Sequence, residues 1–199
     1  MTYQNRKGFT LIELLVVIAI IAILLGLVFP VFQGVQDRAK KVQAKNDLTQ
    51  VVTAMNAFYT EYGRYPTTAT SDAAAIYGPG NLSSKALFDE LRAKNTSSTA
   101  LNSRQIVFIS PAEDTSQINP KGKIGSDGQF YDPSGSAYSI GMDADYDNQI
   151  TPNPYGANNG AGASPIRQGV IAWSLGKDKK LGNDGDGKYT GSDDVISWQ

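Results

Sequence analysis

The sequence contains neither cysteine nor histidine among its 199 residues. Without cysteine there are no disulfides, thiolate metal ligands or cysteine nucleophiles. Without histidine the chain cannot form Ser-His-Asp or Cys-His catalytic groups, nor imidazole metal sites. Any metal site is therefore restricted to hard cations held by oxygen, such as calcium or magnesium. Since no other set of residues supports catalysis, we expect a protein that is not an enzyme.

An excess of basic residues is also lacking. Lys and Arg number 18 and Asp and Glu number 19, which gives a net charge of -1. A nucleic-acid partner is not expected, because affinity for a phosphate backbone depends on clustered positive charge. The acidic residues are unevenly spread, however: residues 127–199 contain ten Asp against five Lys or Arg, a local net charge of -5. The length suggests one domain with an appendage.

One long apolar run stands near the N-terminus. Residues 9–32 are almost entirely apolar, and the sixteen residues from Leu14 to Phe29 contain no polar side chain. As a helix the 24-residue run would extend about 36 Å, enough to cross a hydrocarbon core of about 30 Å. Arg6 and Lys7 precede it, so the positive-inside rule predicts a cytoplasmic N-terminus and an outward-facing remainder.

Three interpretations of this run compete. It is a secretory signal peptide, a plain membrane anchor, or a segment that follows a short cleavable leader ending at Gly8. The single acid, Glu13, bears on the choice. A carboxylate inside an apolar span costs about 2.5–3.5 kcal/mol on insertion scales, so its presence points to a function. The alternative is that Glu13 merely lies at the headgroup boundary.

The residues around Glu13 decide between these interpretations. Basic residues are followed by Gly8-Phe9-Thr10-Leu11-Ile12-Glu13 and then by the uninterrupted apolar run, with Pro30 near its end. In this order, from Arg6 to Phe32, the sequence resembles the type IV pilin and type II secretion pseudopilin superfamily.

The resemblance implies a processing and assembly sequence for this segment. A prepilin peptidase of the inner membrane would cut between Gly8 and Phe9, and the new amine of Phe9 would be methylated. Glu13 would then pair with the Phe9 amine of a neighbouring subunit, and a low-dielectric surrounding makes each charge need such a partner. Filaments of this superfamily lose helix in part of this segment, and Gly26 and Pro30 make such a loss plausible between Ala22 and Pro30.

The fold that we predict is α+β, with one long helix over about residues 9–62. Residues 33–62 carry apolar side chains at three- and four-residue steps, as an amphipathic helix does. Pro30 removes a helical hydrogen bond and predicts a kink. Gly63 and Pro66 mark the end of the helix. The predicted organisation is thus a cleaved leader (1–8), an apolar helix half (9–32), an amphipathic half (33–62) and a globular head (63–199).

The head is predicted to contain a small antiparallel sheet packed on the long helix. A short helix is expected over Ser84–Lys94. The strands are expected at Gln105–Ile109, Tyr138–Met142, Gly169–Leu175 and Asp194–Trp198. The segments 67–80 and 95–103 are expected to be loops, and 151–165 a loop insertion. Trp173 and Trp198 are interpreted as core residues rather than as a ligand-stacking pair.

Two acidic clusters are candidate calcium sites. The first is Asp143, Asp145 and Asp147, whose D-x-D-x-D spacing lets alternate side chains converge on one ion. The segment departs from an EF-hand, because Asn148 stands where that motif has Gly and Pro154 stands where it has a bidentate Glu. A solvated acidic turn that binds no ion is the open alternative.

The second cluster lies near the end of the sequence. It resembles the C-terminal calcium-binding loop of type II secretion major pseudopilins, from S-L-G-x-D at Ser174–Asp178 to the closing Trp198. The resemblance implies that calcium is bound here, and a solvated loop with salt bridges to the nearby lysines is the alternative. Many type IV pilins have a disulfide that stabilises the C-terminal region, and this chain lacks cysteine. Bound calcium would stabilise that region instead. The candidate ligands are Asp178, Asp184, Asp186, Asp193 and Asp194.

Together these features predict a structural subunit of a bacterial helical filament. Its expected partners are other copies of the chain, minor pilins or pseudopilins, an inner-membrane assembly platform and the prepilin peptidase. We expect a single-pass inner-membrane precursor with a periplasmic head, and then a periplasmic or cell-surface filament. A major-pseudopilin-like subunit of type II secretion is the favoured form. The alternative is a type IV pilin for adhesion, motility or DNA uptake, and the different-class rival is a membrane-anchored, metal-dependent enzyme or binding module.

Overall fold

The computed structural model describes residues 8–116 and 120–199. Arg6, Lys7 and the rest of the predicted leader before Gly8 lie outside the described residues. The side chains of residues 27–33 inside the first helix are not described either, so the kink predicted at Pro30 also lies outside them. The chain forms two compact units, residues 1–39 and 40–199.

The first helix, α1, runs over Leu11–Tyr62. It starts two residues later than predicted and ends where predicted. Its end is set by Gly63, whose φ of 66° is the left-handed conformation common after a helix, and whose N–H donates to the Tyr59 carbonyl at 2.7 Å. Within the described residues, no helix meets the combination of length and hydropathy that a bilayer crossing requires.

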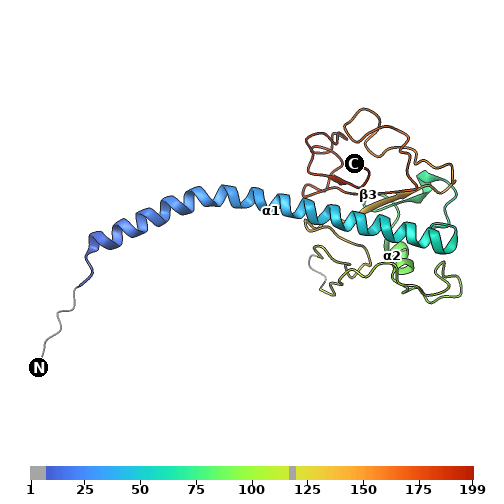
Figure 1. The fold of residues 1–199 in the computed structure, drawn as a ribbon, viewed down its shortest axis with the longest axis horizontal. Coiled ribbons are helices and arrows are strands. Elements are labelled where there is room, and N and C mark those ends of the chain that lie inside the picture. Colours follow the sequence, from blue (N-terminus) through green and yellow to red (C-terminus); the bar gives the residue numbers. More distant parts are fainter. Residues whose placement is uncertain (1–7, 117–119) are drawn as a thin grey trace, which may run out of the picture. The chain divides into compact units, whose positions relative to one another are not determined.

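The unit of residues 40–199 contains the head, which is α+β as predicted (Figure 1). After α1 come a 3-10 helix, η1 (Asp72–Ala75), strand β1 (Ile76–Tyr77) and helix α2 (Lys85–Leu91). Strands β2 (Ser139–Met142), β3 (Val170–Ser174) and β4 (Val195–Ile196) follow. The four strands form one antiparallel sheet in the order β1-β2-β3-β4.

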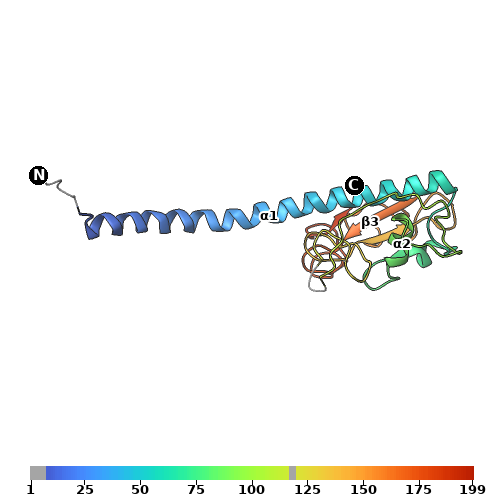
Figure 2. The same cartoon turned by 90° about the horizontal axis from the view of Figure 1, so that it is seen from below.

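The sheet is buried on both faces, and alternate residues of β3 demonstrate it. Val170 and Ala172 belong to the core that includes Leu48 and Phe58 of α1. Ile171 and Trp173 belong to a second core, formed with apolar residues of the loops after β2 and β3. This two-residue alternation is the normal consequence of strand geometry. The head therefore has three layers, helix, sheet and loops, and the part of α1 from residue 40 onward lies along one face of the sheet in both views (Figure 2).

The stripe of α1 that faces the sheet is fully apolar. Its buried residues recur at three- and four-residue steps, as the amphipathic pattern predicted. Phe58 is 0% exposed, and its ring lies 5.3 Å from that of Phe108. The buried members of the stripe are Ala44, Leu48, Val51, Ala54, Met55 and Phe58.

The strand predicted over Gln105–Ile109 is wrong, because this segment is irregular. Its polar backbone groups are satisfied by other partners. Ile106 is bonded to the Asn102 side chain through both its N–H and its carbonyl, at 3.0 and 2.7 Å. The N–H groups of Phe108 and Ile109 both donate to the Leu91 carbonyl. Groups already bonded in this way are not available to a ladder.

The other predicted elements are confirmed with different bounds. The predicted helix over Ser84–Lys94 is realised as the shorter α2, and the last three predicted strands as β2, β3 and β4. The loop predicted over residues 67–80 in fact contains η1 and β1. Trp173 is buried as predicted, and the half-buried Trp198 packs on the same core and donates to the Ala161 carbonyl at 2.6 Å.

Candidate functional site

The first candidate site is the junction that precedes α1. Gly8, Phe9 and Thr10 are not helical, and α1 begins at Leu11. The Gly8–Phe9 peptide bond therefore lies two residues before the helix, in chain that is free of helical hydrogen bonds. Gly8 and Phe9 are both exposed, and cleavage between them stays a prediction.

Glu13 and Thr10 form a reciprocal cap at the start of α1. The Thr10 N–H and hydroxyl both donate to Oε2 of Glu13, at 2.8 and 2.7 Å, and the Glu13 N–H donates to the Thr10 hydroxyl at 3.3 Å. This is a capping box, which satisfies amide groups that a helix start leaves without partners. The Glu13 carboxylate thus has Thr10 as a partner within its own chain, and its side chain is also exposed.

The helix that follows this cap exposes its apolar side chains on every face. Large apolar residues from Leu11 to Leu25 are between 46% and 88% exposed. Soluble monomers rarely leave so extended an apolar surface in water. This part of α1 requires lipid or other protein around it, and Glu13 is the one acidic residue between Leu11 and Leu25.

The second candidate site is the cluster of acidic residues next to β4. Asp178, Asp193 and Asp194 each bring one carboxylate oxygen to within 4.8 Å of the others. Asp178 and Asp193 are half-buried, and each accepts a backbone hydrogen bond, from Lys180 at 2.9 Å and from Lys177 at 2.5 Å respectively. These three residues are members of the set predicted from the sequence.

Asp194 is the buried member of this cluster, at 4% exposure. Its Oδ2 accepts hydrogen bonds from the Tyr155 hydroxyl at 2.8 Å and from the Gly182 N–H at 2.7 Å. Its Oδ1 is buried and finds no hydrogen-bond partner among the residues that the structure describes. Burial raises the pKa of Asp194 to about 6, with a further contribution from the carboxylates of Asp193 and Asp178.

An unpartnered carboxylate oxygen beside two further carboxylates is a costly arrangement without a cation. The oxygen-only donor set and the small, turn-forming residues around it fit a hard ion such as calcium. The residues that would hold the ion are Asp178, Asp193 and Asp194.

Asp184 and Asp186 do not join this cluster, although the sequence suggested them as ligands. Asp184 is exposed, and one of its oxygens lies 3.8 Å from the Lys180 ammonium. Asp186 closes its own turn by accepting from the N–H groups of Asn183 and Lys188, at 3.0 and 2.8 Å. Both side chains belong to the solvated part of the loop.

The third candidate site combines predicted and unpredicted acids. Asp143 and Asp145 converge with Asp72 of η1, whereas Asp147 is not part of the group. Sequence analysis missed Asp72 because it is separated from Asp143 by 71 positions. The carboxylates of Asp72 and Asp143 are each bonded on both oxygens by backbone N–H groups, with distances from 2.9 to 3.1 Å. These bonds order the loop after β2, and they leave the buried oxygens of both residues satisfied.

Comparison with known proteins identifies the N-terminal segment. A family model described as the prokaryotic N-terminal methylation motif matches residues 3–29. The type II secretion system core protein G of Klebsiella michiganensis is 37% identical over 79 residues, which cover 40% of this chain and 56% of that protein. The corresponding protein of Pseudomonas aeruginosa is 35% identical over 79 residues, 40% of this chain and 56% of its own length.

A pilin is found among the relatives as well. The type IV major pilin protein PilA of Myxococcus xanthus is 46% identical over 61 residues, 31% of this chain and 28% of that protein. No solved structure matches the chain. The chain spans about half the length of the core G proteins that it matches. The resemblance to the type IV pilin and type II secretion pseudopilin superfamily is confirmed, and the methylation motif contains Gly8, Phe9 and Glu13.

Proposed function

We propose that this chain is the structural subunit of a bacterial helical filament, of the major-pseudopilin type that serves type II secretion. One observation carries the proposal: an apolar helix exposed on all sides begins at Leu11, two residues after Phe9, and bears Glu13 in its first turn. The methylation motif over residues 3–29 and the core G relatives support it.

In this proposal the precursor is held in the inner membrane by residues 9–32, with the head in the periplasm. The peptidase removes residues 1–8, and the amine of Phe9 is methylated. During assembly Glu13 turns from its cap on Thr10 to the Phe9 amine of a neighbouring subunit. Both groups are in a low-dielectric surrounding, where a single hydrogen-bonded pair offsets two desolvation costs.

We further propose calcium as the structural ion of the head, held by Asp178, Asp193 and Asp194. Bound calcium supplies positive charge where three carboxylates meet. The chain's part is to bring together Asp178 of the loop after β3 and Asp193 and Asp194 at the start of β4, and thereby to fix the loop between them. Because the ion binds the folded head only, it adds its binding free energy to folding.

No catalytic part is proposed for any residue. The relatives carry names of secretion and pilin proteins, and the chain contains neither cysteine nor histidine, on which Ser-His-Asp and Cys-His catalytic groups depend. The alternative within the superfamily is a type IV pilin, and the PilA relative is the observation that favours it. Partner proteins beyond other copies of the chain, such as minor pseudopilins and an assembly platform, follow from the same proposal.

The test is Glu13→Ala in the host strain, with filaments imaged by electron microscopy and full-length protein measured by immunoblot. We expect normal protein levels and loss of filaments. The control is Glu61→Ala, which removes an exposed acid of the same helix that pairs with Arg104 in the head, and should leave filaments intact. Unchanged filaments in Glu13→Ala, or the absence of any filament in the parent strain, would contradict the proposed function.

A further inference from the structure

The head contains chemically reactive pairs in which aspartate or asparagine is followed by glycine. The glycine amide nitrogen, which no Cβ of its own residue shields, can attack the preceding side chain and close a five-membered succinimide ring, which water then reopens. The reaction needs an unbonded glycine N–H and a side chain that can turn toward it. The pairs are Asp127–Gly128, Asn159–Gly160, Asp184–Gly185 and Asp186–Gly187.

Two of the aspartate pairs are held by hydrogen bonds. In Asp127–Gly128 the glycine N–H donates to the Gly125 carbonyl at 2.9 Å, and the carboxylate accepts from the Tyr131 hydroxyl at 2.7 Å. In Asp186–Gly187 the glycine N–H donates to the Leu181 carbonyl at 3.1 Å. Oδ1 of that aspartate accepts from two N–H groups of its own turn, at 3.0 and 2.8 Å. In both pairs the attacking nitrogen and the side chain are therefore already bonded elsewhere.

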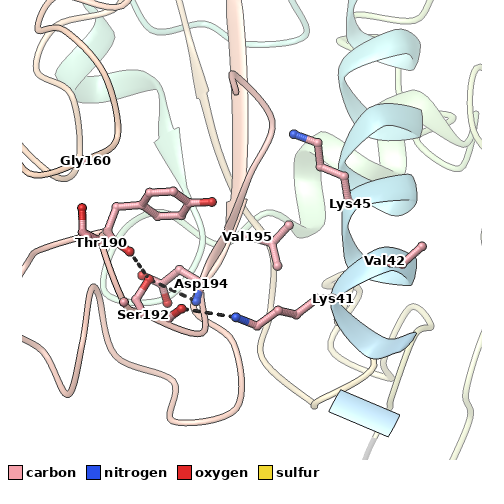
Figure 3. A pocket seen from close by; sticks show the side chains of 10 residues that line it. Lys41, Val42, Lys45, Gly160, Thr190, Ser192, Asp194 and Val195 are labelled. Atoms are coloured by element: carbon pink, nitrogen blue, oxygen red, sulfur yellow. Dashed lines mark hydrogen bonds between the residues drawn. The ribbon is translucent and has the colours of Figure 1, made fainter. Parts of the chain in front are cut away.

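The asparagine pair, Asn159–Gly160, is packed against a neighbouring loop. The side-chain amide of Asn159 donates to the Tyr155 carbonyl at 2.6 Å. The main-chain carbonyl of the same residue accepts from the N–H groups of Tyr189 and Thr190, at 2.9 and 3.3 Å. Gly160 lies beside Thr190 and leaves no space for a Cβ between them (Figure 3). Rotation of this peptide toward the geometry of attack would break these contacts.

The remaining pair, Asp184–Gly185, lies open at the tip of a turn. The Asp184 side chain is 86% exposed, and one of its oxygens lies 3.8 Å from the Lys180 ammonium, an exposed pairing of little strength. Among the residues that the structure describes, the Gly185 N–H has no hydrogen-bond acceptor. Both the nucleophile and the side chain that it attacks are thus accessible.

The geometry of this turn offers little resistance to the reaction. Its two central residues have positive φ, 52° at Asp184 and 89° at Gly185, as in a type I′ turn. The turn is closed by a hydrogen bond of 3.1 Å from the Asp186 N–H to the Asn183 carbonyl. Attack requires a rotation of the main chain at Asp184 that opens this bond. A left-handed conformation is less favourable for aspartate than for glycine, so the turn is weakly held at this residue.

We propose that Asp184 is a site of spontaneous isomerisation to isoaspartate in the folded protein. The Gly185 nitrogen forms a bond to Cγ of Asp184 and gives its proton to water, while the carboxyl hydroxyl leaves with a proton as water. Water then adds to the main-chain carbonyl carbon of Asp184, and the original peptide bond breaks as its nitrogen regains a proton from solvent along the new amide. The mass is unchanged, because one water is lost and one is gained.

The product alters the loop that carries the acidic cluster next to β4. The main chain now runs through Cγ of residue 184 and is longer by one carbon, and the α-carboxylate becomes the side group. Gly182, two residues earlier, donates its N–H to Oδ2 of Asp194 at 2.7 Å, so the longer segment adjoins the cluster. The inference concerns the head alone and requires neither calcium nor filament assembly.

The test compares the folded full chain in detergent with the same chain unfolded in guanidinium chloride. Both are warmed in heavy-oxygen water at about pH 6, where ordinary aspartate keeps a small protonated fraction that can lose its hydroxyl. Peptides are prepared in ordinary water, and electron-transfer fragmentation locates each isoaspartate. A residue that reacted during the incubation carries a heavy oxygen atom, which separates it from any formed during digestion.

Folding should slow the reaction at Asp184 by less than about threefold and at the other three pairs by about tenfold or more. Asp184→Glu is the matched control, because it keeps the charge but would have to close a less favourable six-membered ring. Its peptide should remain unlabelled. Protection of Asp184 equal to that of the other pairs, or an earlier modification at any of them in the folded chain, would overturn the proposal. So would a label in the Asp184→Glu peptide, which would place the reaction at Asp186.

Discussion

The Tyr155 hydroxyl donates a 2.8 Å hydrogen bond to Oδ2 of Asp194, while Oδ1 of the same carboxylate is buried without a partner among the described residues. Tyr155 belongs to the loop after β2 and Asp194 adjoins β4, so the bond joins the layer of loops to the sheet. One oxygen of Asp194 is thus bonded within the fold, and the other is the oxygen that the proposed calcium ion would bind.

Calcium should stabilise the full-length protein through this oxygen. At a calcium concentration about one hundred times the Kd, the stability gain is about 2.7 kcal/mol. Asp194→Asn should abolish most of that gain, because an amide is a poorer ligand and carries no charge. Thermal unfolding of the detergent-solubilised protein with calcium or with a chelator measures it. Asp184→Asn is the control, and an equal calcium response in both variants would exclude Asp194 as a ligand.

In calcium-free buffer the same carboxylate should make stability depend on pH. Burial raises its pKa from 3.8 to about 6, so the folded state binds its proton more tightly than the unfolded state does. This contribution to stability is therefore present at low pH and is lost as the pH rises from about 4 to 6. Urea unfolding across this range, compared between wild type and Asp194→Asn, isolates the effect. A wild type that gains stability relative to Asp194→Asn over that interval would refute the assignment.

Gly176 tests the position of Asp193. Its φ is 62°, and a Cβ there would lie 2.6 Å from the Asp193 carboxylate. Gly176→Ala should therefore displace Asp193 and weaken calcium binding about tenfold or more, in addition to a backbone cost of about 1 kcal/mol. Gly187→Ala is a matched control, because its φ is 73° and a Cβ there meets nothing within 4 Å.

The two glycine variants are compared by calorimetric titration with calcium. We expect a similar loss of thermal stability in both and a loss of affinity in Gly176→Ala alone. Equal affinities would mean that Asp193 does not contribute to the site.

The helix–sheet core should depend strongly on Phe58. Its ring is fully buried and contacts the rings of Tyr62 and Phe108, with centroids 4.6 and 5.3 Å away. Phe58→Ala should cost about 3–5 kcal/mol, as truncation of a buried aromatic residue usually does. Asn56→Ala, on the exposed face two residues before, should change stability by less than about 0.5 kcal/mol. Denaturant unfolding followed by tryptophan fluorescence distinguishes them.

Local signals in the sequence were sufficient for much of this fold. The apolar stripe of α1 and the apolar runs of β2 and β3 are patterns that extend over only a few residues each, so the sequence alone predicts them. The end of α1 is likewise marked locally, by Gly63. The segment 105–109 has the composition of a strand, but the Asn102 side chain and the Leu91 carbonyl take its hydrogen bonds. Such competition is decided by tertiary neighbours and cannot be read from propensity.

The candidate sites, too, could be predicted where their residues are neighbours in sequence and not where distant segments meet. Gly8, Phe9 and Glu13 are adjacent in sequence and form a recognisable motif. For the acidic loop near the end of the sequence, the resemblance suggested five candidate ligands but not which of them lie together, since all five are surrounded by similar small and polar residues. Asp72 joins Asp143 only through the packing of η1 against β2, a contact between distant segments that no local pattern contains.

The central claim is tested most directly by the intact mass and N-terminal sequence of the protein purified from its host. The proposed function predicts a mature chain that begins at Phe9 and carries a methyl group on its amine. The matched control is a Gly8 variant that the peptidase cannot cut, which should retain the leader and form no filaments. A chain that begins at Met1 would make residues 9–32 a plain anchor, and a chain that begins after Phe32 would make them a discarded signal. Either of these starts would contradict the account.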